Sequence, residues 1–393
     1  MIDLGSAQRY LRDHSLDAWL LYDFDGMNPI FWEVVGTKVH TTRPCTLFIP
    51  ANGTPTFLVH QVDAGKFIEF QTNVIAYLGR ADMQHKMGDL LQVGKKVAME
   101  YSPLGALPVI SRVDAGTIEF IRSLGVTVVS SADIIQATLA RLDATQMATH
   151  IAAARKLNNV VHEAFALIAK KVPVGVTEYD VCDFIRRRFS EEGLYTDSGP
   201  VVAVNEHSGD PHYEPTPATS KTIRQGDWVL IDLWAKENQE NAIFSDITWV
   251  GFVGQEAPEK YQKVFDVVTK ARDLALRLVR EVYERGETLE GWQVDECARN
   301  FITDQGYGPY FTHRLGHSLG KIVHSYAVNL DNFETRDTRR IVPGIAFTIE
   351  PGIYLPDFGV RSEINVVMTD RGPVITTPLQ ESIVFMAPLV EKR

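Results

Sequence analysis

Cysteine is scarce in this chain of 393 residues. The three cysteines, Cys45, Cys182 and Cys297, are widely separated and form no Cys-x-x-Cys pair. An odd number of scattered cysteines excludes a disulfide framework, and the missing Cys-x-x-Cys pair argues against a thiolate zinc site. Both absences are typical of a reducing compartment, so we expect a cytoplasmic protein.

Export signals, membrane segments and excess positive charge are missing as well. The first residues, Met-Ile-Asp-Leu-Gly-Ser, lack the basic segment and apolar core of a secretory signal. No apolar run approaches the roughly 18 residues of a membrane helix. The 39 Lys and Arg against 50 Asp and Glu give a formal net charge of −11, which argues against non-specific nucleic-acid binding. We expect neither membrane nor nucleic acid among its partners.

The length exceeds that of one ordinary core, so two domains are expected. Hydrophobic content of 45% and charged content of 23% are typical of a soluble globular protein. Short apolar runs, with helical stretches between some of them, predict a smaller α/β domain over residues 1–140. The runs expected to form strands are residues 17–22, 45–49, 55–59, 96–100 and 126–130.

Residues 141–393 contain a repeated pattern. A long amphipathic helix is predicted from about residue 143, and Thr177 with Asp180 has the spacing of a capping box for a second helix. The segment from Gly175 to Gly193 is echoed by Gly286 to Gly306, and a long apolar-periodic stretch precedes each. We infer two related halves, each a helix pair followed by a strand hairpin, around a pseudo-twofold axis.

The echo continues into four acidic residues. Asp232 lies six residues after a glycine at the start of a strand-like run, and Glu350 lies six residues after another. A second acid follows each, 14 residues on at Asp246 and 13 residues on at Glu363. A single acid in an apolar strand is commonly a satisfied buried residue, whereas two acid pairs with the nearby His317 suit a pair of divalent cations. Such a pair can activate water for hydrolysis.

Two further features accompany these acids. Three histidines, at 313, 317 and 324, lie in one stretch with glycines at 316 and 320, which allow close approach of the backbone to a ligand. Strand alternation predicts that Arg361 and Glu363 share one face of a strand. Arg361 then either forms a structural ion pair with Glu363 or captures a substrate carboxylate, which its planar fork suits.

The order Asp, Asp, His, Glu, Glu, with Gly-His-Ser-Leu-Gly, Thr-Ile-Glu-Pro-Gly-Ile-Tyr and Val-Arg-Ser-Glu, resembles the pita-bread metallopeptidases. The resemblance covers residues 145–393 and is greatest to the proline-specific branch, Xaa-Pro dipeptidase (prolidase) and aminopeptidase P. It implies an α+β pita-bread catalytic domain with internal pseudo-twofold duplication, preceded by a smaller α/β domain for substrate access and dimerisation. That first domain argues against methionine aminopeptidase.

The resemblance also implies roles in the metal centre. Asp246 and Glu363 would bridge two divalent metal ions, Asp232 would complete one site, and His317 and Glu350 would complete the other. Manganese is the expected metal, with zinc or cobalt as alternatives. A water activated by both metals would attack the carbonyl before proline, with Glu350 as the proton shuttle.

Four more residues receive roles from the resemblance. His324 would stabilise the tetrahedral intermediate, His212 and His313 would line the substrate pocket, and Arg361 would bind the proline carboxylate of a dipeptide. The expected partners are a small peptide with proline at its second position and a second copy of the chain in a homodimer.

The chain differs from the proline-specific branch at positions around the five ligands, whereas the ligands themselves are retained. Phe244 stands where tyrosine is common, Trp249 where arginine is common, Ser325 where glutamate is common and Arg314 where glycine is common. They bear on the choice between an Xaa-Pro dipeptidase, which we predict, and an aminopeptidase P acting on longer peptides. Five intact ligands count against a creatinase-like amidinohydrolase and against a non-catalytic binding module on the same scaffold.

Overall fold

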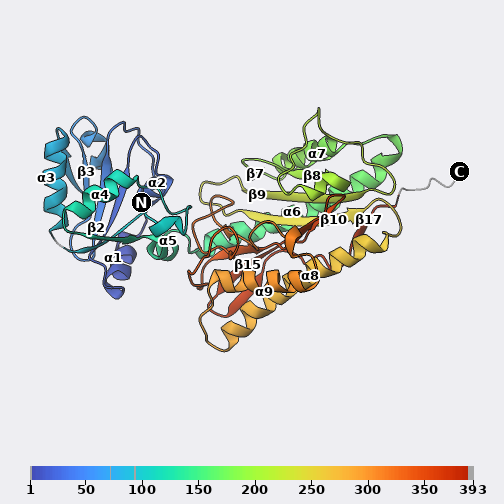
Figure 1. The fold of residues 1–393 in the computed structure, drawn as a ribbon. Coiled ribbons are helices and arrows are strands. Elements are labelled where there is room, and N and C mark those ends of the chain that lie inside the picture. Colours follow the sequence, from blue (N-terminus) through green and yellow to red (C-terminus); the bar gives the residue numbers. More distant parts are fainter. Residues whose placement is uncertain (1, 71, 93, 388–393) are drawn as a thin grey trace. The chain divides into compact units, whose positions relative to one another are not determined.

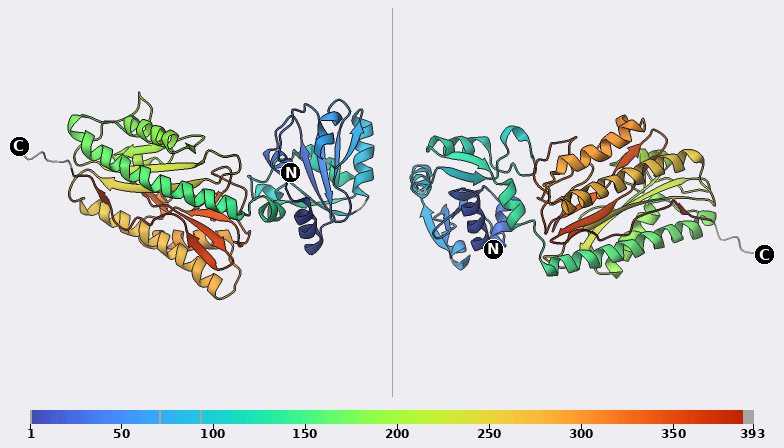
Figure 2. Two further views of the ribbon diagram at one scale, coloured as in Figure 1. Left: turned by 180° about the vertical axis from the view of Figure 1, so that it is seen from behind. Right: turned by 90° about the horizontal axis from the view of Figure 1, so that it is seen from below.

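The structure, a computed structural model, describes residues 2–70, 72–92 and 94–387. The chain forms two compact units, residues 1–141 and 142–393. Figure 1 labels many of their helices and strands, and Figure 2 shows them from two further directions. Each unit has its own sheets and its own apolar core.

The first unit contains a six-stranded sheet in the order β4-β3-β2-β1-β5-β6. Its strands are β1 (Ala18–Asp23), β2 (Cys45–Pro50), β3 (Thr56–His60), β4 (Asn73–Tyr77), β5 (Lys96–Met99) and β6 (Thr127–Ser130). Neighbours among β1, β2 and β3 are antiparallel, and the other pairs are parallel. All five predicted runs form strands, and β2 and β3 pair as an antiparallel hairpin. The fold adds β4, an edge strand in which only Tyr77 is buried.

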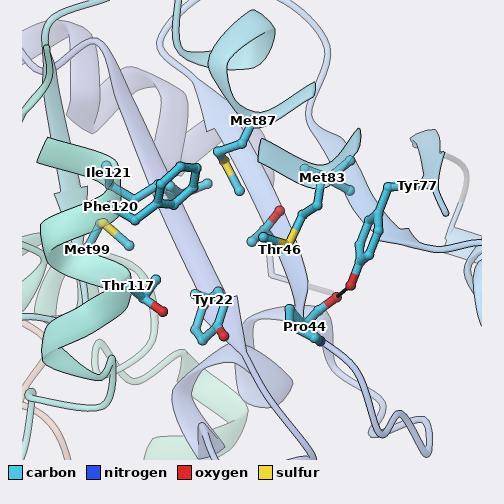
Figure 3. Close-up of a pocket in the computed structure, with 12 residues that line it drawn as sticks. Tyr22, Pro44, Thr46, Tyr77, Met83, Met87, Met99, Thr117, Phe120 and Ile121 are labelled. Atoms are coloured by element: carbon cyan, nitrogen blue, oxygen red, sulfur yellow. Dashed lines mark hydrogen bonds between the residues drawn. The ribbon is translucent and has the colours of Figure 1, made fainter. Parts of the chain in front are cut away.

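Helices pack against this sheet, and two of them leave an apolar recess. The helical segments are α1 (Leu4–Asp13), α2 (Pro29–Val35), η1 (Ala64–Phe70), α3 (Arg80–Leu91), η2 (Pro103–Gly105), α4 (Ala115–Ser123) and α5 (Ala132–Thr138). A recess of about 50 Å³ lies among α3, α4 and the strands, where Met83, Met87, Met99 and Phe120 point toward one another (Figure 3).

A buried carboxyl group ties this unit together. Glu100, directly after β5, is fully buried and accepts hydrogen bonds from Trp19 Nε1 at 2.7 Å, Asn28 Nδ2 at 3.1 Å and Ser131 Oγ at 3.2 Å. Burial raises the pKa of Glu100 to about 7, because the charged form loses more hydration than these donors return.

The second unit begins with a helix pair and a sheet. Its first elements are α6 (Ala144–Lys171), η3 (Val172–Val174), α7 (Glu178–Glu191), β7 (Leu194–Tyr195), β8 (Val201–Val204), η4 (Asn205–Gly209), β9 (Trp228–Glu237) and β10 (Ser245–Phe252). The predicted capping box of Thr177 and Asp180 is confirmed at the start of α7. Helix α6 packs on β9 and β10 through an apolar core that includes Ile231, Leu233 and Ile247.

A second helix pair, again followed by strands, then begins. The later elements are α8 (Glu259–Glu284), α9 (Gly291–Asp304), η5 (Gly308–Tyr310), β11 (Ser318–Leu319), β12 (Ala346–Ile349), β13 (Gly352–Tyr354), β14 (Gly359–Arg361), β15 (Ile364–Thr369), β16 (Gly372–Ile375) and β17 (Val384–Phe385). Helices α6 and α7 have 28 and 14 residues, and α8 and α9 have 26 and 14, so the predicted echo extends to the helix lengths. Strands β11, β12, β15 and β16 form the second sheet of this unit, and β17 pairs with β10.

One buried amide joins the two sheets. The Oδ1 atom of Asn365, in β15, accepts from Ser245 Oγ at 2.7 Å and from the Asp246 backbone N–H at 3.0 Å, both in β10. Its Nδ2 donates to the Asp246 carbonyl at 2.6 Å. The seam between the halves is therefore fixed by side-chain bonds next to the predicted metal ligands.

A membrane span was not expected. Among the helices formed by the described residues, none is both long and apolar enough to cross a bilayer.

Candidate metal centre and substrate cavity

The first acid pair projects from one face of the β9–β10 hairpin. Asp232 pairs with Thr248 in the antiparallel register, and Asp246 lies two residues before Thr248 on the same strand. Because side chains alternate between sheet faces, Asp232, Thr248 and Asp246 share the face opposite the apolar side chains that meet α6.

The second acid pair lies at the end of a ladder. Ile349 of β12 pairs with Ile364 of β15, so Glu350 directly follows one strand and Glu363 directly precedes the other. The strand predicted to carry both Arg361 and Glu363 is interrupted here: β14 ends at Arg361 and β15 begins at Ile364. That prediction of one continuous strand is wrong, because Arg361 belongs to the separate β13–β14 hairpin.

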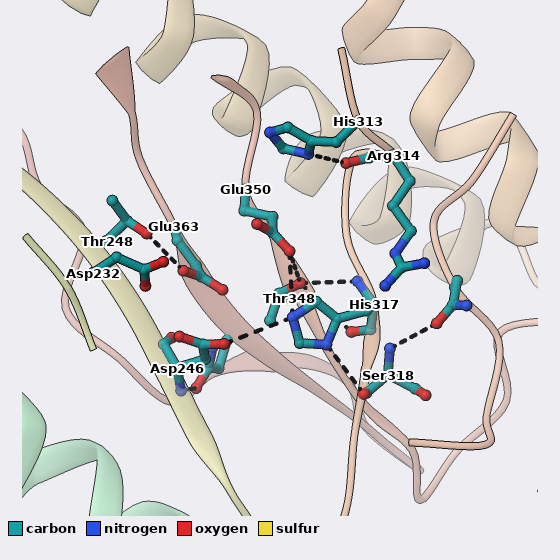
Figure 4. A network of polar contacts seen from close by, with 12 residues as sticks. Asp232, Asp246, Thr248, His313, Arg314, His317, Ser318, Thr348, Glu350 and Glu363 are labelled. Atoms are coloured by element: carbon teal, nitrogen blue, oxygen red, sulfur yellow. Dashed lines mark hydrogen bonds and ion pairs between the residues drawn. The ribbon is translucent and has the colours of Figure 1, made fainter. Parts of the chain in front are cut away.

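The structure brings the predicted ligands together. One side-chain ligand atom each of Asp246, His317 and Glu363 lie within 4.8 Å of one another, and all three residues are buried. His317 Nε2 is 3.6 Å from Asp246 Oδ2 and 3.3 Å from Glu350 Oε1. Figure 4 shows Asp232 next to Glu363, and Glu350 near the His317 ring. The five residues thus surround one small volume.

The donor set fits divalent cations. Asp232 Oδ1, Asp246 Oδ1 and Glu363 Oε1 are buried oxygens with no hydrogen-bond partner among the described residues. Burial, and then the neighbouring carboxylates, raise the pKa of Asp246 and of Glu363 well above the usual range. Buried carboxylates without partners are costly, and hard cations that prefer oxygen ligands would offset that cost.

His317 is oriented as a neutral ligand. Its Nδ1 lies 3.2 Å from the Ser318 carbonyl oxygen, which can only accept, so Nδ1 carries the proton. The Nε2 lone pair then faces the acids. Burial lowers the pKa of His317, which favours the neutral ring. A hydrogen bond on the far nitrogen is the usual support of a metal-bound histidine.

The ion-pair partner of Arg361 is Asp232 and not Glu363. It is 5% exposed, and its Nη2 donates to Asp232 Oδ2 at 2.5 Å, so the ion pair considered with Glu363 is replaced by one with Asp232. Its Nε donates to Thr248 Oγ1 at 2.9 Å and its Nη1 to Tyr354 OH at 2.8 Å. Capture of a substrate carboxylate by Arg361 stays a prediction, and it would require one of these contacts to change.

The predicted histidines line the same cavity. The His313 ring accepts from Tyr354 OH at Nε2 (2.7 Å) and donates from Nδ1 to the Arg314 carbonyl (2.6 Å), and burial lowers its pKa to about 3. His324 lies edge-on to His317, with ring centroids 4.3 Å apart. Two protonated rings at this distance would repel each other, and this repulsion together with burial lowers the pKa of His324 to about 3. His212 is exposed on the loop after η4.

The cavity has a volume of about 680 Å³, which is typical of a small-molecule site. Its wall includes residues that the sequence did not single out, among them Asp197, Trp234 and Glu334. Two hydroxyls behind it also matter: Thr248 Oγ1 donates to Glu363 at 2.9 Å, and Thr348 Oγ1 donates to Glu350 at 3.0 Å. The sequence contains a signal for both threonines, because Thr248 lies two residues after Asp246 and Thr348 two residues before Glu350, a spacing that favours one face of an extended chain.

Comparison with known proteins agrees with this geometry. The family described as Metallopeptidase family M24 matches residues 150–370. The probable dipeptidase PepE of Mycobacterium tuberculosis is 27% identical over 350 residues, which cover 87% of this chain and 85% of that protein. The crystal structure of dipeptidase PepE from Mycobacterium ulcerans is similar with a TM-score of 0.74 at 22% identity, covering 98% of this chain and 97% of that one.

A prolidase from Thermococcus sibiricus gives a TM-score of 0.69 at 23% identity, covering 97% of this chain and 98% of that one. These likenesses show the fold, the α+β pita-bread fold with its internal duplication and a smaller first domain. The family match spans more than half of the chain and includes all five predicted ligands. The chain therefore belongs to the metallopeptidase family M24.

Proposed function

We propose that this protein is an Xaa-Pro dipeptidase that uses two divalent metal ions to hydrolyse the bond before proline in dipeptides. The observation that carries the proposal is the buried group of Asp246, His317 and Glu363, with ligand atoms within 4.8 Å of one another and unpartnered oxygens on both acids. This group opens on a cavity large enough for a peptide. Membership of a metallopeptidase family supports the same chemistry.

Five residues would hold the metals. Asp246 and Glu363 come from different halves and are suited to bridge, while Asp232 would complete one site and His317 with Glu350 the other. Manganese is our first choice because four of the five ligands are carboxylates, and zinc or cobalt are the alternatives. When bound, two such cations lower the pKa of a water molecule and polarise a carbonyl group.

The chain itself supplies proton transfer and orientation. Glu350 lines the cavity and is held by Thr348, so its carboxylate can take a proton from water and pass it to the leaving nitrogen. His324 lines the same wall and can donate a hydrogen bond to the oxygen that becomes negative in the transition state. His212 and His313 would contact the substrate on either side.

A second candidate follows from the size of the cavity. A volume of about 680 Å³ also accommodates a peptide longer than a dipeptide, which favours aminopeptidase P activity as the alternative.

We further propose a cytoplasmic homodimer in which residues 1–140 serve substrate access and dimerisation. Light scattering of the purified chain checks the dimer, and a monomer at assay concentration would reject it.

The deciding experiment compares three substrates. Chelated enzyme, re-supplied with Mn²⁺, is given Ala-Pro, Ala-Pro-Ala and Ala-Ala. We expect fastest cleavage of Ala-Pro. Equal or faster cleavage of Ala-Pro-Ala would reject the dipeptidase assignment in favour of aminopeptidase P, and no metal-dependent cleavage of any substrate would reject the peptidase proposal.

A further inference from the structure

The cavity wall contains a cation that the proposed reaction leaves unused. Arg314 directly follows His313 and lies three residues before His317, and it lines the cavity. Its side chain is 24% exposed. Figure 4 shows that side chain extending from its loop along the side of His317. Of the four histidines that line the cavity, His313, His317 and His324 are near enough for the Arg314 charge to lower their pKa.

Arg314 keeps free donors, unlike Arg361. The three donor groups of Arg361 are bonded to Asp232, Thr248 and Tyr354. Among the described residues, the Arg314 side chain bonds only through Nη1, which donates to Glu334 Oε2 at 3.3 Å. Guanidinium presents five N–H groups in a planar fork, so Nε and Nη2 remain available to an anion.

The covalent length of a dipeptide limits where its carboxylate can bind. The scissile carbonyl carbon and the terminal carboxylate carbon are separated by only the nitrogen and the α-carbon of the second residue. When the scissile carbonyl lies against Glu350 and His317, the carboxylate therefore has to lie on an adjacent wall. Arg314, with its free donors on the His317 side of the cavity, satisfies that condition.

We propose that Arg314 binds the free carboxylate of the dipeptide and thereby selects dipeptides over longer peptides. The inference rests on the proposed peptidase function. Glu334 also lines the cavity, and its Oε1 accepts from the Arg314 backbone N–H at 3.0 Å. Asp331 Oδ1 fixes it further by accepting from the Glu334 backbone N–H at 2.9 Å. Glu334 then competes with the substrate carboxylate for the guanidinium, so the two side chains have opposite effects on binding.

The test measures kcat and KM for Ala-Pro and for Ala-Pro amide, which lacks the carboxylate charge. Arg314→Gln should lower kcat/KM for Ala-Pro by about 10- to 100-fold, mainly through KM, because a hydrogen bond to a charged group is lost. The amide should change by less than about threefold. Glu334→Gln should lower KM for Ala-Pro, and Arg314→Lys should recover part of the loss. Arg336→Gln is the control, since Arg336 is exposed and stacks on Trp292 outside the cavity.

The outcomes separate this inference from the proposed function. If Arg314→Gln lowers kcat/KM equally for Ala-Pro and Ala-Pro amide, or if Glu334→Gln lowers kcat/KM as Arg314→Gln does, the two side chains have only a structural role. The inference is then wrong, while the peptidase proposal stands. If the wild-type enzyme cleaves neither substrate, both fail. If circular dichroism shows that Arg314→Gln does not fold, Glu334→Gln and Arg314→Lys test the inference. A lower KM for Ala-Pro in Glu334→Gln and a higher KM in Arg314→Lys support it, and any other pair of results overturns it.

Discussion

The metal centre predicts that Glu363→Gln changes the stability of the protein in opposite directions without and with metal. Four carboxylates, Asp232, Asp246, Glu350 and Glu363, face one another in a buried volume with one permanent cation, Arg361, beside them. If all four are ionised, three negative charges remain uncompensated. Glutamine keeps the shape of Glu363 but removes one charge, so the variant should be more stable than the wild type without metal and less stable with it.

The magnitude follows from the distances. Two like charges about 4 Å apart repel by about 4 kcal/mol at an effective dielectric constant of about 20. Partial protonation and Arg361 reduce this, which leaves about 1–3 kcal/mol to be regained by the substitution. For a domain of this size that corresponds to a rise in melting temperature of about 2–12 °C. Metal at 100 times its dissociation constant stabilises the wild type by about 2.7 kcal/mol, and the variant loses most of this.

The same acids set the pH dependence. Burial and mutual repulsion raise the folded-state pKa values of Asp246 and Glu363 above those of the unfolded chain. The folded state then holds protons that the unfolded state has released, so metal-free stability falls as pH rises from the ordinary carboxyl pKa to the raised one. Calorimetry of wild type and Glu363→Gln, with EDTA and with Mn²⁺, checks both effects. A variant that is less stable than wild type under both conditions would refute this reasoning.

Three further predictions concern supporting residues. Thr248→Val removes the hydrogen bonds to Glu363 and Arg361 and should weaken metal affinity by about 10- to 100-fold in a competitive chelator titration; unchanged affinity would exclude this support. Because burial raises the pKa of Glu100 to about 7, wild-type stability should fall between about pH 4.5 and 7, and Glu100→Gln should flatten this slope in urea unfolding; an unchanged slope would contradict the assignment. In α9, Arg299 Nε donates to the buried Asp295 Oδ2 at 2.8 Å. Arg299→Met leaves Asp295 without its ion-pair partner and should cost about 3–5 kcal/mol of unfolding free energy, whereas a loss below about 1 kcal/mol would show that the pair is dispensable.

The parts of the fold that sequence reasoning predicts are those set by local pattern. The strand runs of the first unit are continuous apolar segments, and the start of α7 has its cap at Thr177. The acids could be proposed together because duplication repeats the spacing from glycine to acid in both halves. Edge strand β4 lies outside the prediction although Val74, Ile75, Ala76 and Tyr77 form a short apolar run, so the sequence signal was present and was not used.

The partners of charged side chains were beyond sequence reasoning. Arg361 and Asp232 are 129 residues apart, and their contact depends on how the β13–β14 hairpin packs against β9. The contact between Arg314 and Glu334 depends likewise on the loop that Asp331 holds. Local pattern fixes which residues form strands, whereas the packing of distant elements decides which donor meets which acceptor.

The seam at Asn365 has a consequence for how the chain could be divided. Each half supplies two of the four acids, so neither half alone carries a complete chelating set. Metal ions would act as a clasp across the seam, and their binding energy would be linked to the docking of one half on the other. Two fragments cut between β10 and α8 should therefore reassemble more tightly when the metal is supplied, as in a split-protein complementation pair whose association is controlled by a cation.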